Sequence, residues 1–236
     1  MILIILTIVP VSLYELQTLK RFALYFLAKI FIVSFSFFND AEHTNAPLNQ
    51  KNNSIRIYSG YFSRPFINIL FLGDISAEYH NTIIRGIDYS KVLKEKSLNS
   101  PISTSARISI IRHLERGFQN NHNQYNLSFT WYYHSKMNSI PIRWFFSEGI
   151  SYAENVPYVE GLHTRRLSNE RDSKIMNYMN VGFDFRLSDL MKNNNFSSYR
   201  IGLSNSHRSG IYKKIKLFNN TKGGSNYINL FLEYEF

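Results

Sequence analysis

Residues 126–134 read NLSFTWYYH, and their apolar and polar side chains alternate. Leu127, Phe129, Trp131 and Tyr133 share one parity, whereas the other parity carries mostly polar groups. Because neighbouring side chains of a β-strand point to opposite faces of the sheet, this period indicates a strand with two different faces. The alternation recurs along the chain from about residue 53, and no clear stripe with a helical period accompanies it.

Eight segments of this kind can be distinguished. We expect strands near residues 53–62, 81–93, 103–114, 124–136, 140–153, 173–187, 197–209 and 225–236. Most are longer than the roughly 5–6 residues of an average soluble strand, and roughly 9–11 residues suffice to cross a bilayer. Their second face carries Arg, Asp, Glu, Ser and Gly, as the interior of a small transmembrane barrel does. The expected fold is an all-β, eight-stranded antiparallel outer-membrane barrel over residues 47–236; the stretch 66–80 is ambiguous between strand and short helix.

The N-terminal region predicts an export signal. Lys20 and Arg21 precede an apolar run, 22–38, which matches the charged and apolar regions of a secretory signal peptide. A transmembrane helix is the alternative, since the run approaches the length of a span. Lys29 within the run and the polar sequence after it favour export, with residues 1–46 as signal peptide and linker. The protein is then expected in the outer membrane of a Gram-negative bacterium.

Composition narrows the function classes. The chain has no cysteine, which excludes a disulfide framework and a cysteine nucleophile. Its 16% aromatic content and net charge of +10 also suit a nucleic-acid binder or a lectin-like sandwich. However, the aromatic residues share a face with aliphatic ones, which indicates contact with lipid and argues against a nucleic-acid partner. The cations fall on the other face and in loops, where we expect them to meet phosphorylated lipid.

Near the C-terminus, polar residues occupy positions of the strand face that is otherwise apolar. His207 and Ser209 are in step with Ile201 and Leu203, on the face expected to contact lipid. Polar groups on that face of a barrel cost free energy and call for a functional explanation. If residues 197–209 and 225–236 pair about a turn near 217–218, position 209 faces Asn226. A hydroxyl, an imidazole and an orienting polar group are the parts of a nucleophile–base–orienter triad. Ordinary residues at the membrane rim are the alternative.

The C-terminal 40 residues, 197–236, resemble a known family. The sequence SHRSGI, then GGSNY and a terminal aromatic strand, is similar to the lipid A 3-O-deacylases (PagL-like) of bacterial outer membranes. The resemblance implies an eight-stranded barrel that hydrolyses an ester-linked acyl chain of lipopolysaccharide. It implies His207 as base, Ser209 as nucleophile and Asn226 at the third position. Asn226 replaces the family's acid, and Gly210 stands at the oxyanion or rim position after the serine, where the family has asparagine.

Further expectations concern ligands. We expect Arg165, Arg166, Arg171 and Lys174 to contact lipopolysaccharide phosphates or to form a solvated loop. The seven histidines show no metal-binding spacing, so neither a metal nor a cofactor is expected. The expected partners are the membrane and lipid A; whether two barrels form a homodimer is left open. Two alternatives to a deacylase remain: a structural or lipopolysaccharide-binding barrel without catalysis, and a soluble periplasmic barrel or sandwich.

Overall fold

The computed structural model describes residues 51–63, 82–96, 100–137, 139–166, 169–211 and 215–236. The leader expected over residues 1–46 and the ambiguous stretch 66–80 lie outside the described residues. The expected division between leader and barrel therefore stays a prediction.

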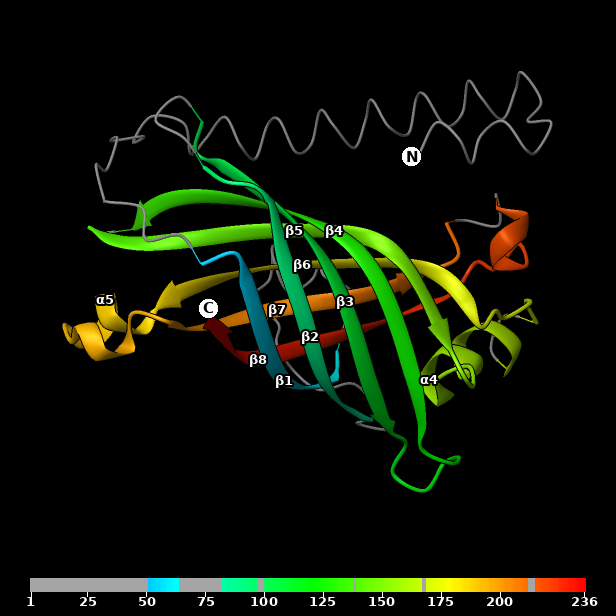
Figure 1. Ribbon diagram of the computed structural model, residues 1–236. Helices are drawn as coiled ribbons and strands as arrows, with labels where there is room; N and C mark the ends of the chain where they lie inside the picture. Colours follow the sequence, from blue (N-terminus) through cyan, green and yellow to red (C-terminus); the bar gives the residue numbers. More distant parts are fainter. Residues whose placement is uncertain (1–50, 64–81, 97–99, 138, 167–168, 212–214) are drawn as a thin grey trace, which may run out of the picture. The chain divides into compact units, whose positions relative to one another are not determined.

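Eight strands close into one antiparallel barrel, each pairing with its neighbours in sequence and β1 pairing with β8 (Figure 1). They are β1 (Asn53–Phe62), β2 (Ile83–Lys94), β3 (Ile102–Leu114), β4 (His122–Met137), β5 (Ile140–Ala153), β6 (Ile175–Arg186), β7 (Tyr199–Ser209) and β8 (Gly224–Glu235). Every strand begins and ends within two residues of its expected bounds, so the predicted fold is confirmed.

Short helical turns connect the strands at both ends of the barrel. The loop end, where β1, β3, β5 and β7 finish, carries α4 (Tyr158–Gly161), η2 (Leu162–Arg166) and η4 (Lys216–Phe218). The terminal end, near the C-terminus, carries α5 (Leu187–Met191) and η3 (Asn194–Phe196) (Figure 1). None of the helices in the described residues is long and apolar enough to cross a membrane.

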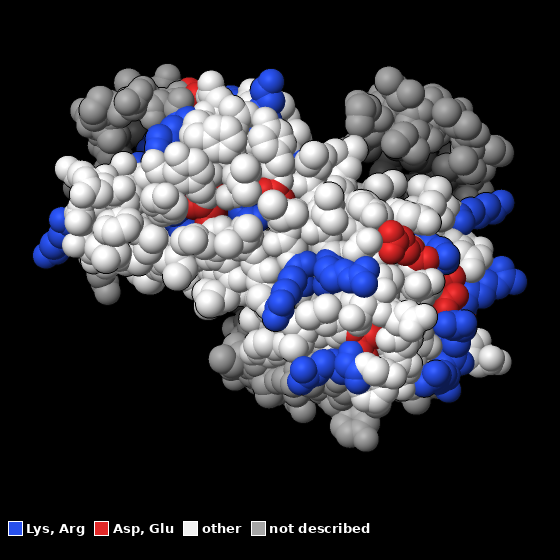
Figure 2. Space-filling model, turned by 60° about the horizontal axis from the view of Figure 1, so that its bottom comes forward, with Lys and Arg blue, Asp and Glu red and all other residues white. Residues whose placement is uncertain are grey.

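The barrel has an apolar outer face and a polar interior. Ile57, Ile108, Leu127 and Leu230 point outward and are more than half exposed. Figure 2 shows broad uncharged areas of the molecular surface between groups of charged side chains. This distribution is that of a transmembrane barrel, whose outer wall faces lipid and whose interior is polar. It argues against the soluble alternative, and closure of the sheet excludes a sandwich.

Ion pairs fill the middle of the barrel. Glu233 accepts hydrogen bonds from Arg56 Nε (2.7 Å), Arg143 Nη2 (2.7 Å) and Arg107 Nη2 (3.3 Å). Asp184 pairs with Arg143 and Arg200, at 2.9 and 2.7 Å. The guanidinium of Arg56 also lies 3.7 Å from the centre of the Phe231 ring. The expectation that inward-facing cations meet phosphorylated lipid is therefore wrong, because carboxylates inside the barrel pair with them.

The Glu233 contacts predict a large effect on stability. Replacing Glu233 with glutamine leaves three buried guanidinium groups without their shared charge, and losing one partner of a buried pair costs about 3–5 kcal/mol. Urea unfolding in detergent or lipid, followed by tryptophan fluorescence, measures the difference. Glu95→Gln, at an exposed position just after β2, is the control and should leave stability unchanged. An exposed ion pair contributes up to about 1 kcal/mol. A smaller loss of stability for Glu233→Gln would contradict the view that Glu233 is the shared partner of three buried arginines.

Candidate functional site

The outer face of β7 changes from apolar to polar as the strand approaches the loop end. Leu203 is 44% exposed on this face, and Asn205, His207 and Ser209 follow it at the same parity. The intervening Arg208 points inward and is buried. The prediction that His207 and Ser209 share the outward face is therefore supported by the burial pattern of the strand.

His207 and Asn226 are direct cross-strand partners on β7 and β8. His207 Nδ1 donates to Asn226 Oδ1 at 2.8 Å. Because the amide oxygen accepts this proton, the imidazole holds its hydrogen on Nδ1, and Nε2 then carries a lone pair that can accept another; the Ser225 backbone also contacts the ring. That is the tautomer which a general base in a serine triad requires.

The expected pairing of position 209 with position 226 is wrong by two residues. Ser209 lies opposite Gly224, and Asn226 lies opposite His207. The Gly210 amide donates to the Gly223 carbonyl at 3.1 Å, which extends the β7–β8 ladder and places the turn one residue earlier than expected. The shift improves the triad geometry, since the orienting group now faces the imidazole directly.

Ser209 has a local hydrogen bond. Its Oγ accepts from the Ile211 amide at 3.1 Å. Among the described residues, no hydrogen bond joins Ser209 to His207. The two side chains lie on the same face two residues apart, and a hydroxyl that accepts from the Ile211 amide still has its own hydrogen to donate. Catalytic hydrogen bonds often tighten only when substrate binds.

Gly210 has little space around its α-carbon. A Cβ atom there would lie 2.1 Å from the Thr221 carbonyl oxygen, which no real side chain tolerates. This close approach explains glycine at the position after the serine. Since the Gly210 amide already donates to Gly223, it does not offer a free donor to an oxyanion.

Two further polar residues of this face were missed in the sequence. Glu148 on β5 has the outward parity of Phe146 and Ile150, and the Asn177 side chain on β6 hydrogen-bonds to it. Asn177 lies directly opposite Ser209. Alternation along 144–152 could have identified Glu148, but placing Asn177 required the strand register. We call the resulting set, which shares the outward parity, the outer polar patch; it consists of Glu148, Asn177, Asn205, His207, Ser209 and Asn226, of which Asn177 and Asn205 are buried.

The four expected phosphate-binding cations are exposed beyond β5 and before β6. Arg165 pairs with Asp172 at 2.5 Å, and Arg166 lies over the Tyr158 ring at 4.9 Å. A cavity of about 550 Å³ at the loop end is lined by Arg165 and Lys174, together with amide side chains such as Asn120 and Asn219. Arg171 and Arg166 are not among its lining residues. In the view of Figure 2, many Lys and Arg side chains gather toward the right.

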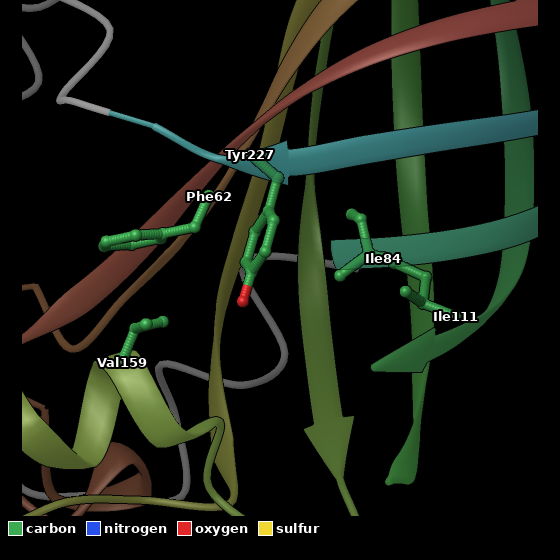
Figure 3. Packing of buried hydrophobic residues seen from close by; sticks show 5 residues of the cluster. All are labelled: Phe62, Ile84, Ile111, Val159 and Tyr227. Atoms are coloured by element: carbon green, nitrogen blue, oxygen red, sulfur yellow. The ribbon is translucent and has the colours of Figure 1, made fainter. Parts of the chain in front are cut away.

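The barrel interior beneath the loop end is closed by an apolar cluster. Figure 3 shows Val159 of α4 beside Phe62 and Tyr227, with Ile84 and Ile111 completing the cluster. Next to it, the β3–β4 hairpin brings His113, Glu115 and His122 together, a group able to hold a metal ion. The spacing argument against a metal missed this group because its histidines meet across two strands.

Glu160 of α4 lies at the same end. It is fully buried, and burial raises the pKa of its carboxyl group, while the nearby Arg208 opposes the shift. Arg208 Nη1 lies 3.8 Å from Glu160 Oε2, and Ser225 Oγ donates to the same oxygen at 3.1 Å. The helical turn of α4 is thus tied to the interior faces of β7 and β8.

Comparison with solved structures identifies the class of fold. The chain is similar to the crystal structure of the outer membrane enzyme PagL, with a TM-score of 0.52 and 10% identity. The match covers 78% of this chain and 99% of that one. The N-terminal β-barrel domain of Pseudomonas aeruginosa OprF matches with a TM-score of 0.40 and 14% identity, over 79% of this chain and 100% of that one. No family model matches the chain, and no curated protein matches it in sequence.

Proposed function

We propose that the protein is an outer-membrane esterase that removes an acyl chain from lipid A, with the outer polar patch as its active site. The observation that carries the proposal is the His207–Asn226 hydrogen bond on the outward face, beside Ser209. A nucleophile there would meet the acyl chains of the membrane itself. The likeness to the fold of the outer membrane enzyme PagL adds support.

The proposed chemistry uses the lone pair on His207 Nε2. His207 Nε2 takes the proton of Ser209 as its Oγ attacks the ester carbonyl, and Asn226 keeps the ring oriented through Nδ1. The imidazolium then protonates the leaving sugar oxygen, and water attack on the acyl-serine releases the fatty acid. Asn177 lies opposite Ser209, and its side-chain amide has a second N–H besides the one that bonds to Glu148, so it is our candidate donor to the oxyanion; the single Gly210 N–H is already engaged.

The lipid phosphates would bind at the loop end. Arg165 and Lys174 line the 550 Å³ cavity there, and Arg166 and Arg171 are exposed in the same connection. Cations at the loop end would bind the phosphates of the lipid A head group. Its acyl chains would then extend along the outer wall of the barrel toward Ser209. Residues 1–46 would direct the chain to the outer membrane of a Gram-negative bacterium.

A barrel without catalysis is the second candidate. The observation that favours it is that Ser209 Oγ accepts from the Ile211 amide, whereas no hydrogen bond joins it to His207 among the described residues. In that case the outer polar patch binds lipopolysaccharide, or lies at the membrane rim without a reaction.

The purified barrel separates the two candidates. Folded protein in detergent is incubated with lipid A, and mass spectrometry follows both the lipid and the released fatty acid. Loss of one acyl chain, in proportion to enzyme and time, is the expected result. Intact lipid A after long incubation with protein that shows heat-modifiable migration would contradict the esterase and leave the binding barrel.

A further inference from the structure

The loop end of the β3–β4 hairpin encloses two imidazoles and one carboxylate. His113 and His122 face each other across the strands, and their rings stack with centroids 4.7 Å apart and planes 3° from parallel. Glu115 follows β3, and its Oε1 lies 3.6 Å from His122 Nδ1. All three residues are at most 1% exposed, and one donor atom of each lies within 4.8 Å of the others.

Each histidine has one nitrogen engaged and one unused. His113 Nε2 bonds to Gln124 Oε1 at 2.8 Å, and His122 Nδ1 bonds to the Asn120 carbonyl at 3.4 Å. Both acceptors require the hydrogen on the engaged nitrogen, which leaves a lone pair on the other. Those other atoms, His113 Nδ1 and His122 Nε2, are buried and have no hydrogen-bond partner among the described residues.

The carboxylate of Glu115 likewise has one oxygen engaged in hydrogen bonds and one oxygen unused. Glu115 Oε1 accepts from Gln119 Nε2 at 3.0 Å and from the Tyr158 amide of α4 at 3.1 Å. Its Oε2 is buried without a partner within the described part of the chain. Three acceptors in one buried group thus lack a partner, and an unpaired buried polar atom costs about 1–3 kcal/mol.

We propose that His113, Glu115 and His122 bind one divalent transition-metal ion of the Zn²⁺ type. Two imidazole nitrogens and one carboxylate oxygen are a common protein ligand set for Zn²⁺ and leave one position for water. In metal sites, the second nitrogen of a histidine ligand is typically held by a carbonyl or carboxylate. The bonds to Gln124 and Asn120 meet that requirement. Ligating carboxylates are also hydrogen-bonded in such sites, as Glu115 is through Oε1.

Binding requires a rearrangement, because the 3.6 Å contact in the group joins His122 Nδ1 and Glu115 Oε1, which are the engaged atoms. Donor atoms around a tetrahedral Zn²⁺ lie about 3.3 Å apart, so the three side chains must move closer together than in this structure. A ligating nitrogen directs its lone pair in the plane of its ring, so one of the stacked rings must turn. The positive charge of Arg208 lies nearby but is balanced by Glu160, at 3.8 Å. The ion would join the 115–121 loop to α4 through Glu115. This role does not depend on the esterase proposal.

Metal titration of the folded barrel in detergent tests the site. We expect one Zn²⁺ per chain by equilibrium dialysis, and a visible absorption spectrum with Co²⁺ characteristic of nitrogen and oxygen ligands. Glu115→Gln keeps the size and the Oε1 acceptor but removes the charge. It and His122→Gln should each weaken binding by more than about 100-fold, since loss of outer partners alone gives about 10–100-fold.

The matched control is His134→Gln, on the same strand at the terminal end, where the histidine bonds to Ser103 Oγ. This variant should bind Zn²⁺ as the wild type does. Heat-modifiable migration verifies that each variant is folded. Absence of saturable Zn²⁺ and Co²⁺ binding in the folded wild type would overturn the proposal. Equal binding by the wild type, Glu115→Gln and His122→Gln would overturn it as well, because the ion would then lie elsewhere.

Discussion

Replacing Ser209 with alanine is expected to abolish deacylation of lipid A. The change removes the only hydroxyl of the outer polar patch while His207 and Asn226 keep their hydrogen bond. Loss of the serine in a triad lowers the rate by roughly 10³-fold or more. Mass spectrometry of lipid A after incubation with folded variant and wild type measures the loss.

Ser59→Ala is the matched control for this experiment. Ser59 is exposed on the outer face of β1, and its hydroxyl donates to the Ile84 carbonyl at 3.3 Å. Removing that hydroxyl should leave the rate within about two-fold of the wild type, because surface changes away from the site have small effects. Equal activity of folded Ser209→Ala and wild type would assign the hydrolysis to another group and refute the serine mechanism.

The architecture could be predicted from the sequence because the two faces of each strand meet different solvents. Trp131 faces outward and Thr130 inward, and the same contrast separates Phe183 from Asp184. Such alternation fixes both the strand bounds and the closure into a barrel. Parity does not show which interior charges meet. Arg56 and Glu233 are 177 residues apart, and only the β1–β8 closure joins them.

The candidate site could be predicted in part. Parity placed His207 and Ser209 on one face, but the turn position decided which residue lies opposite them. An error of one residue in the turn centre moves the pairing by two positions, from Ser209–Asn226 to His207–Asn226. Contributions from other strands, such as Asn177 and the His113–His122 pair, depend on register and were not visible in local spacing.

Replacing Asn226 with aspartate is expected to accelerate deacylation by up to about 10⁴-fold, the loss seen when a serine triad has its carboxylate replaced by an amide. Asn226 Oδ1 already accepts from His207 Nδ1, so the tautomer is correct and an aspartate needs no new backbone position. What the amide lacks is the negative charge that stabilises the imidazolium formed as Ser209 loses its proton. Initial rates of fatty-acid release at equal amounts of folded protein measure the gain.

Asn205→Asp separates this effect from charge alone. Asn205 lies two residues before His207 on the same outward face and pairs with Ile228 across β8, not with the imidazole. Asn205 is buried, and a carboxylate there does not contact Nδ1, so this variant should not reproduce the gain of Asn226→Asp. If Asn226→Asp is folded and no faster than the wild type, His207 does not become positively charged in the rate-limiting step, and the imidazole is not the general base of this barrel.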